Sequence, residues 1–378
     1  MPSPLPVLFV HHTAVLGGAE RSLVELAADL RRGAAFDPAL ALPVPGTLSD
    51  AAAAAGVPVE RAPLAHWPRR AGVFRRARDI ARVFPLTLRL RSILKRRGAR
   101  LIHANSTLAA LQAAPAAWLS RRPLVWQLRD RLPPRFILRI LRRIVRIAIG
   151  LTEEAAQMLR DAGFEARAIP NGIDADAFPR PDRAESRRTL GLAPDAPFVL
   201  CAAQFVPWKR HAELLEAFAV VRRTLPSARL LLAGQDPHGA HPDLLPGLRA
   251  RADRPDLAGT VSFLGQRDDV PILLAACNLV AHPAREEPFG RIFLEAGAAL
   301  RCIVCADGPG PRAIVAPACP AAVLRDVSPE PLAAAILERL QRPDLARAET
   351  EALGRRVREA FPRKAVAERV SRLYGEIL

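Results

Sequence analysis

The residues best suited to chemistry gather in one segment, Ala284–Glu295, with the sequence Ala-Arg-Glu-Glu-Pro-Phe-Gly-Arg-Ile-Phe-Leu-Glu. The segment follows a strand-like apolar run and opens a helix-like stretch. Backbone N–H groups around Phe289–Ile292 then lie at a helix start, where they can bind an anion, and Gly290 lets a phosphate approach closely. Two carboxylates, Glu287 and Glu295, flank this point. The segment predicts a phosphate-binding site, although such carboxylates also stabilise a helix dipole without any ligand.

Short apolar runs alternate with helical patterns along the chain, and these elements must position the segment. We expect strands at Val7–Val10, Ala39–Leu42, Leu101–His103, Leu124–Gln127, Ile147–Ile149, Ala166–Ile169, Phe198–Ala202, Arg229–Ala233, Val261–Leu264, Leu279–His282 and Ile303–Ala306. Helices are expected at Ala19–Arg31, Glu153–Ala162, His211–Thr224, Asp269–Ala276 and Arg291–Leu300. This alternation predicts an α/β protein with parallel, doubly wound sheets.

The alternation runs twice, with a turn signal at Pro170-Asn171-Gly172 between the halves. It predicts a Rossmann-like domain over residues 1–170, a second over 171–360 and a C-terminal helix over 361–378. Ligands of open parallel sheets bind at the carboxyl ends of the strands, so the expected site is the cleft between the two domains.

Several further stretches carry recognisable motifs. They are Gly17–Glu20 after the first strand, Ile169–Asp174 between the halves, Trp208–Lys209, Phe263–Gly265 and the terminal Phe361–Leu378. In this order, and together with the Glu-x7-Glu spacing of Glu287 and Glu295, they resemble the retaining GT-B glycosyltransferases of family four (group 1). The resemblance implies transfer of a hexose from a UDP- or GDP-linked donor to a lipid-linked or cell-envelope glycan, with retention of configuration and with no metal or other cofactor.

The resemblance assigns donor contacts in the second domain. It places Glu287 on the hexose hydroxyls and Glu295 on the nucleotide ribose. The backbone amides of Gly290 and Arg291, next to Phe289, hold the diphosphate.

The resemblance also assigns Lys209 to the departing diphosphate, where a cation acts mainly in the transition state. Gly17 and Gly18 approach the phosphate or the acceptor through their backbone. Two positions depart from the family pattern: Gln204 stands where an arginine is usual, and Ala313 stands where a glutamate is usual. The alternative reading is therefore a catalytically weak or inactive membrane-associated module of the same fold.

The acceptor side is expected near Asp130, which follows the strand ending in Trp126–Leu128. Asp130 is either an acceptor-side base or an ion-pair partner of a neighbouring arginine. His11, His12 and His103 also stand at strand ends, where a polar residue is either part of a site or an ordinary loop residue.

The net charge of +17 is concentrated in one region. Between Arg61 and Ile147 there are 22 basic and two acidic residues, so the remainder is slightly acidic. Five arginines spaced as on one helix face alternate with apolar residues, which predicts a basic amphipathic helix for an anionic membrane surface or a packed helix with a solvated face; they are Arg135, Arg139, Arg142, Arg143 and Arg146. A second basic run, Arg69–Arg100, adds to this prediction.

Composition excludes several other classes. Five scattered cysteines suggest no disulfide framework, and Cys302 and Cys305 lie three apart in a strand-like run, so their thiols point to opposite faces and cannot share a metal. The basic region lacks the aromatic and zinc-ligand patterns of nucleic-acid binders. No signal peptide or membrane-spanning run is expected, which predicts a cytoplasmic protein, peripheral on the inner face of the cell membrane.

Overall fold

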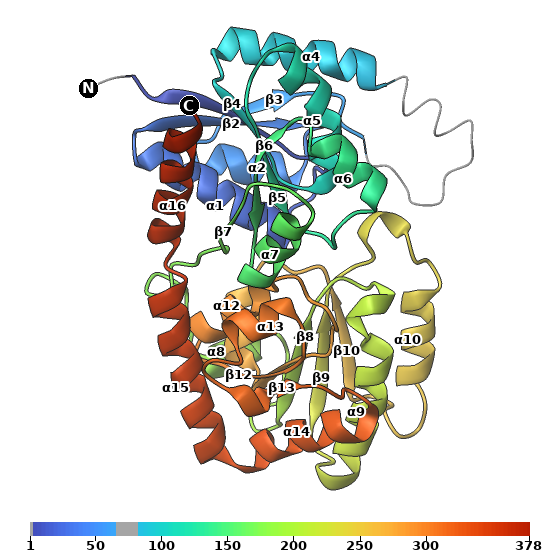
Figure 1. Cartoon of the computed structure of the whole chain (residues 1–378). Coiled ribbons are helices and arrows are strands. Elements are labelled where there is room, and N and C mark those ends of the chain that lie inside the picture. The colour runs from blue at the N-terminus through green and yellow to red at the C-terminus, as the bar shows by residue number, and fades with distance from the viewer. Residues whose placement is uncertain (1–2, 66–81) are drawn as a thin grey trace. The chain divides into compact units, whose positions relative to one another are not determined.

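The computed structural model describes residues 3–65 and 82–378, which form two compact units (Figure 1). Unit 1 comprises Met1–Gly172 together with Arg363–Leu378, and unit 2 comprises Ile173–Pro362. Each unit is built on a parallel sheet flanked by helices. The predicted α/β class with two Rossmann-like sheets is therefore confirmed.

Unit 1 contains a seven-stranded parallel sheet in the order β3-β2-β1-β4-β5-β6-β7. Its strands are β1 (Leu5–Val10), β2 (Phe36–Leu42), β3 (Val59–Arg61), β4 (Leu101–Ala104), β5 (Leu124–Leu128), β6 (Val145–Gly150) and β7 (Ala166–Ala168). Its helices are α1 (Gly18–Arg32), α2 (Thr47–Ala54), α4 (Val83–Arg97), α5 (Thr107–Leu119), α6 (Arg135–Leu141), α7 (Glu153–Asp161) and α16 (Arg363–Ile377).

Alternating side chains of this sheet feed two separate hydrophobic cores. In β1, Leu8 and Val10 pack with α4, α5 and α6, whereas Val7 and Phe9 pack with α1, α2 and α16. Successive residues of a strand point to opposite faces, so a continuously apolar strand such as β1 requires helices on both sides.

Unit 2 contains a six-stranded parallel sheet in the order β10-β9-β8-β11-β12-β13. Its strands are β8 (Phe198–Ala202), β9 (Arg229–Ala233), β10 (Val261–Gly265), β11 (Leu279–His282), β12 (Cys302–Ala306) and β13 (Val323–Leu324). Its helices are α8 (Arg183–Thr189), α9 (His211–Thr224), α10 (Leu244–Ala252), α11 (Val270–Ala276), α12 (Arg291–Ala298), α13 (Pro309–Ile314), α14 (Pro329–Gln341) and α15 (Pro343–Ala360), with short 3-10 turns η1 (Pro207–Lys209), η2 (Pro237–Gly239) and η3 (Pro320–Ala322). Helices α9, α10 and α14 cover one face of the sheet.

The C-terminal helix α16 packs in unit 1 although it is the last element of the chain (Figure 1). Gly172 makes this return possible, because a Cβ there would lie 2.6 Å from the Cα of Arg363 at the start of α16. Arg363 pairs with Asp29 of α1 at 2.9 Å, and Tyr374 is completely buried in the core beneath α1.

The sequence predicts every strand except β3 and β13 to within three residues. Those two strands contain three and two residues. β3 contains one apolar residue and β13 consists of two residues, so neither carries a periodic pattern and only pairing with a neighbouring strand reveals them.

A buried ion pair fastens the last two helices of unit 2 to its sheet. Arg339 of α14 donates two hydrogen bonds to Glu349 of α15, at 2.8 and 2.7 Å, and the thiol of Cys302 in β12 lies 3.4 Å from the same carboxylate. Both charged side chains are buried, so each depends on the other to offset the loss of water.

Glu349→Ala should therefore lower the free energy of unfolding by about 3–5 kcal/mol, because it leaves the Arg339 guanidinium buried without its carboxylate. Urea unfolding measures this change. Glu351→Ala, an exposed glutamate on the same helix, serves as the control and should cost less than about 0.5 kcal/mol. Equal losses in the two variants would contradict the assignment.

Candidate functional site

The loop between β11 and α12 carries the predicted phosphate-binding segment, and two of its residues take left-handed backbone conformations. Glu286 has φ of 58° and Gly290 has φ of 76°. A Cβ on Gly290 would also lie 2.4 Å from the ring of Phe293, so only glycine fits. Gly290 immediately precedes α12, which places the first N–H groups of the helix directly after this turn.

Glu287 is the centre of a buried charged cluster in this loop. Its Oε2 atom accepts a hydrogen bond from the Lys209 ammonium and another, at 2.9 Å, from Nε2 of His282. Burial by itself favours the neutral acid, but the Lys209 charge and the His282 hydrogen bond lower the pKa of Glu287 to about 2. Glu287 is therefore a carboxylate at every physiological pH.

His282 is the last residue of β11 and remains uncharged in this cluster. Burial lowers the pKa of its imidazole, and the nearby Lys209 ammonium lowers it further. The Glu-x7-Glu pattern does not include His282. In the sequence, only its place as a polar residue at the carboxyl end of a buried strand indicates a role in the site.

Lys209 comes from a different part of unit 2, the η1 turn that follows β8. Its ammonium lies 4.0 Å from the centroid of the Trp208 ring, and its side chain is only 11% exposed. Gln204, at the start of the same connection, is exposed. The fold thus brings Lys209 and Glu287 into direct contact, while Gln204 is exposed and uncharged.

Glu295 has its own cationic partner one helical turn away. Arg291 Nε donates to Glu295 Oε1 at 2.8 Å, and both side chains are about nine-tenths buried. Phe289, just before the helix, is buried as well. The second carboxylate of the Glu-x7-Glu spacing therefore lies on α12 as an ion pair, close to the helix start.

Two glycines support the loop from behind. Gly310 donates its N–H to the carbonyl of Glu287 at 2.9 Å, and a Cβ on Gly310 would lie 2.1 Å from the carbonyl oxygen of Phe289. A Cβ on Gly308 would lie 3.0 Å from the Glu287 nitrogen. These glycines belong to the segment that contains Ala313, where the family usually has a glutamate. This segment thus also holds the Glu287 loop in place.

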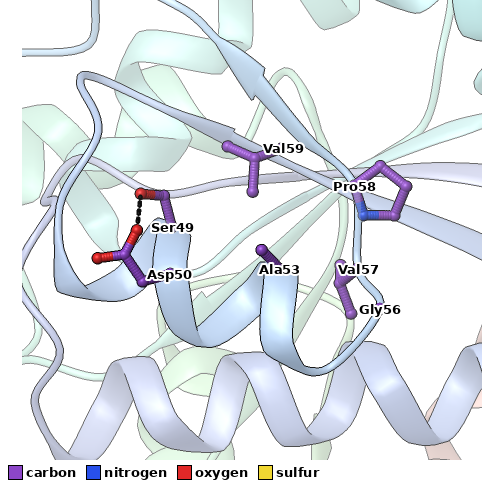
Figure 2. A pocket seen from close by; sticks show the side chains of 7 residues that line it. All are labelled: Ser49, Asp50, Ala53, Gly56, Val57, Pro58 and Val59. Carbon is purple, nitrogen blue, oxygen red and sulfur yellow. Dashed lines mark hydrogen bonds between the residues drawn. The ribbon is translucent and has the colours of Figure 1, made fainter.

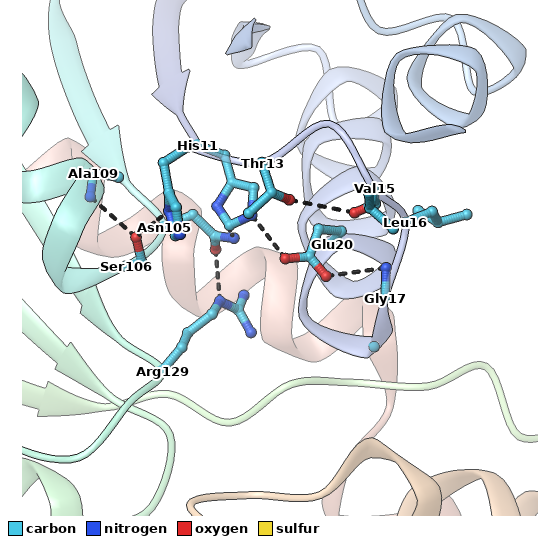
Figure 3. Close-up of polar contacts among 12 residues, drawn as sticks. His11, Thr13, Val15, Leu16, Gly17, Glu20, Asn105, Ser106, Ala109 and Arg129 are labelled. Atoms are coloured by element: carbon cyan, nitrogen blue, oxygen red, sulfur yellow. Dashed lines mark hydrogen bonds and ion pairs between the residues drawn. The ribbon is translucent and has the colours of Figure 1, made fainter. Parts of the chain in front are cut away.

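In unit 1, polar side chains gather at the carboxyl ends of β1, β4 and β5 (Figure 3). His11 lies 2.7 Å from Glu20 through Nε2, and Asn105 accepts from Arg129 Nε at 2.6 Å. The second oxygen of Glu20 accepts the Gly17 N–H at 3.0 Å. Gly17, predicted to approach the phosphate or the acceptor through its backbone, thus donates its N–H to Glu20 in the first turn of α1, which begins at Gly18.

Electrostatics keep Glu20 ionised. Burial raises the pKa of this carboxyl, but the hydrogen bond and charge of His11 and the charge of Arg129 together bring it below its ordinary value. Arg129 also donates to the side-chain oxygens of Gln127 and Asn171, at 3.0 and 2.9 Å. The guanidinium thereby ties the end of β5 to the segment that follows β7.

The remaining predicted residues of this side differ in exposure. His103 lies within the core, where Nδ1 contacts the Tyr374 hydroxyl at 2.6 Å and Nε2 contacts Gln127 at 3.2 Å. Burial lowers the pKa of His103 to about 3, so it is neutral and holds α16 to β4. His12 contacts Ser106 at 3.0 Å, and Asp130 is exposed just beyond β5.

Family models match most of the chain. "Glycosyltransferase Family 4" matches residues 16–177, and "Glycosyl transferases group 1" matches residues 182–356. The chain belongs to glycosyltransferase family four, group 1. D-inositol 3-phosphate glycosyltransferases are relatives: that of Segniliparus rotundus is 31% identical over 183 residues, and that of Mycobacterium avium is 31% identical over 207 residues. The matches cover 48% and 52% of this chain but only 40% and 45% of the length of those relatives.

Solved structures show that this family member has the GT-B fold. HepE from Anabaena in complex with UDP-glucose matches with a TM-score of 0.85 and 24% identity, over 98% of this chain and 100% of that one. WaaG, a glycosyltransferase involved in lipopolysaccharide biosynthesis, matches with a TM-score of 0.71 and 17% identity, over 97% and 99% of the two chains.

The prediction of one basic helix from Arg135 to Arg146 is wrong in its extent. Helix α6 ends at Leu141, and Arg146 lies on β6, where it pairs with Glu165 at 2.8 Å. The cause is sheet pairing, because Val145 and Ile147 align with Leu124 and Val125 of β5. The other four arginines, Arg135, Arg139, Arg142 and Arg143, are exposed. Of the second basic run, residues 69–81 lie outside the described residues, and residues 82–100 include helix α4.

A shallow pocket of about 480 Å³ opens between α2 and β3 of unit 1 (Figure 2). Its lining is Ser49, Asp50, Ala53, Gly56, Val57, Pro58 and Val59. None of these residues was predicted to belong to the functional site. Asp50 is the only charged residue of the lining, so we assign no function to this pocket.

Across residues 3–65 and 82–378, no helix combines the length and apolar character needed to cross a membrane. In the same ranges, no three His, Cys, Asp or Glu side chains are grouped so that they could hold a metal ion. Cys302 and Cys305 contact different partners, Glu349 and the carbonyl of Ala322.

Gly290→Ala should destabilise unit 2 by about 1–3 kcal/mol, since it forces a left-handed conformation on alanine and presses a methyl group into the Phe293 ring. Thermal unfolding followed by circular dichroism measures the change. The same substitution at Gly247, inside α10 with open space around it, should instead stabilise by about 0.5–1 kcal/mol. Changes of the same sign in both variants would contradict the role given to Gly290.

Proposed function

We propose that the chain transfers a hexose from a nucleotide-sugar donor to a lipid-linked or cell-envelope glycan acceptor, with retention of configuration. The observation that carries this proposal is the pairing of Lys209 with the buried carboxylate Glu287 beside the start of α12. A cation, an anion and the N–H groups of a helix start supply partners for a diphosphate and for sugar hydroxyls.

In the proposed donor complex, the diphosphate binds to the Gly290 and Arg291 amides and to the Lys209 ammonium. Glu287 accepts hydrogen bonds from the hexose hydroxyls, and Glu295, oriented by Arg291, accepts from the ribose. Phe289 shapes the loop from its buried position. We propose that the donor is linked to UDP or GDP. The solved structure of HepE, which has a similar fold, contains UDP-glucose.

Lys209 is the catalytic group for departure of the nucleotide. Negative charge on the diphosphate grows as the glycosidic bond breaks, so a fixed ammonium stabilises the transition state more than the ground state. In this proposal Lys209 supplies the charge that a divalent cation supplies elsewhere, and the reaction needs no metal. Gln204, which replaces an arginine, contributes a hydrogen bond without charge.

The acceptor is proposed to bind at unit 1, at the carboxyl ends of β1, β4 and β5. Asp130 is exposed there and serves as the candidate acceptor-side base. The glycine turn at Gly17 and Gly18 opens the same edge, and Glu20 fixes its conformation.

We also propose that unit 1 docks on an anionic membrane at the inner face of the cell membrane. Four exposed arginines, Arg135, Arg139, Arg142 and Arg143, adjoin two exposed apolar residues of α6, Phe136 (63% exposed) and Ile140 (49% exposed). Apolar side chains that enter the interface and arginines that bind lipid phosphates favour the same surface.

Lys209→Ala should reduce kcat by about 100-fold or more, the range for loss of one transition-state electrostatic group. Release of UDP or GDP from a panel of nucleotide hexoses, with wild type first, measures this. Lys364→Ala removes an exposed lysine of unit 1 and should leave kcat unchanged. An increase in KM alone would show that Lys209 provides uniform binding, and a wild-type chain that turns over no donor would favour the non-catalytic module.

Changing Arg139, Arg142 and Arg143 together to Gln should release the protein from vesicles containing anionic lipid, since each basic residue near such a surface contributes about 1 kcal/mol. Co-sedimentation with anionic and with neutral vesicles measures binding, and added salt should weaken it. The matched control changes three exposed arginines of unit 2, Arg188, Arg223 and Arg254, to Gln. Equal loss in both triple variants, or equal wild-type binding to neutral vesicles, would contradict docking through α6.

A further inference from the structure

Glu287 accepts its two side-chain hydrogen bonds on one carboxylate oxygen. Lys209 Nζ and His282 Nε2 both contact Oε2, and among the described residues no group donates to Oε1. The Glu287 side chain is 9% exposed, so the orientation of its carboxylate is set by these two contacts. Oε1 is the atom left to accept from a ligand.

The protonation state of the pair follows from the contacts. Glu287 is ionised and can only accept, so the Nε2 atom of neutral His282 must carry the proton. The opposite ring atom, Nδ1, is then a bare acceptor, and among the described residues it has no hydrogen-bond partner. The imidazole is held by packing instead: Phe293 meets it edge-on, with ring centroids 5.2 Å apart and planes at 86°.

Lys209 and His282, the two hydrogen-bond donors to Glu287, respond differently when a nucleotide sugar binds. In the proposed function, the Lys209 ammonium belongs to the donor diphosphate, which carries more negative charge than one carboxylate. When the ammonium turns to the diphosphate, the attraction that holds Glu287 in place weakens. His282 has no such competing partner, because its N–H already faces Glu287 and its ring is fixed at the end of β11.

We propose that His282 is a positioning residue for the transfer reaction: its Nε2–H keeps Glu287 ionised and keeps Oε1 directed at the donor hexose once Lys209 has turned to the diphosphate. This inference rests on the proposed function and adds to it a residue that the Glu-x7-Glu pattern does not contain.

The titratable groups around Glu287 come from three elements. They are Lys209 of η1, His282 of β11 and, beside them, His211 of α9, whose pKa burial lowers to about 3. His211 is neutral at working pH, so Lys209 and His282 are the groups that offset burial and keep Glu287 ionised. Removal of the His282 hydrogen bond raises the pKa of Glu287, and a protonated Glu287 appears as pH falls.

The decisive experiment compares pH profiles of His282→Phe, which keeps an aromatic ring but has no N–H. Because kcat reports the donor-bound enzyme, where Lys209 is engaged, its acid limb should move up by about one to two pH units, the equivalent of one charge-assisted hydrogen bond. The acid limb of kcat/KM, which reports the free enzyme with Lys209 still on Glu287, should move less. An unchanged kcat profile would overturn the proposal.

A rescue variant and a control separate positioning from structural support. His282→Gln places an amide N–H near the former Nε2 and should restore most of the acid limb. Cys305→Ala changes the residue in register with His282 on β12 and should lower stability without moving the limb. A glutamine variant that behaves like the phenylalanine variant, or a shift of the limb in Cys305→Ala, would overturn the proposal.

One readout does not depend on turnover. Imidazole ¹⁵N spectra of the ligand-free chain, with His282 assigned through His282→Gln, should show the Nε2–H tautomer and no protonated ring at pH 7. An Nδ1–H tautomer or a charged ring at pH 7 would refute the contact, whether or not the protein is active. Absence of turnover with every donor would instead contradict the proposed function.

Discussion

The buried carboxylate of Glu287 is the constraint on which the site of unit 2 depends. An isolated anion at this depth would cost several kcal/mol, so the fold must deliver compensating partners. Lys209 arrives from the turn after β8 and His282 from the end of β11, and both reach the same oxygen. The strained loop and the glycines behind it follow from this requirement, because the carboxylate can meet both donors only if its backbone stays in place.

Unit 1 solves a similar problem with different groups. Glu20 is kept ionised by His11 and by the charge of Arg129, and it closes the first turn of α1 through the Gly17 N–H. Arg129 links three neighbouring side-chain oxygens at the strand ends. In each unit the carboxyl ends of parallel strands collect the polar side chains, since the cores on both faces of the sheet admit few of them.

The basic stretch shows how one sequence pattern supports two structures. The arginines from Arg135 to Arg146 fit a helical face, yet the chain leaves the helix at Leu141 and enters β6 four residues later. Val145 and Ile147 find strand partners on β5, and their burial in the sheet stabilises more than another helical turn exposed to solvent. The exposed arginines that remain are carried by a short helix and the turn after it.

The sequence by itself determined the alternation of strands and helices, the β11–α12 segment with Glu287 and Glu295, and the family, because these depend on residues that are near one another in the chain. Only the tertiary structure decided which distant groups meet: Lys209 and Glu287 are 78 residues apart, and His103 and Tyr374 are 271 apart. It also decided that His282 joins the site and that Arg146 lies on a strand. Strand order and side-chain packing set those outcomes, and neither leaves a local pattern in the sequence.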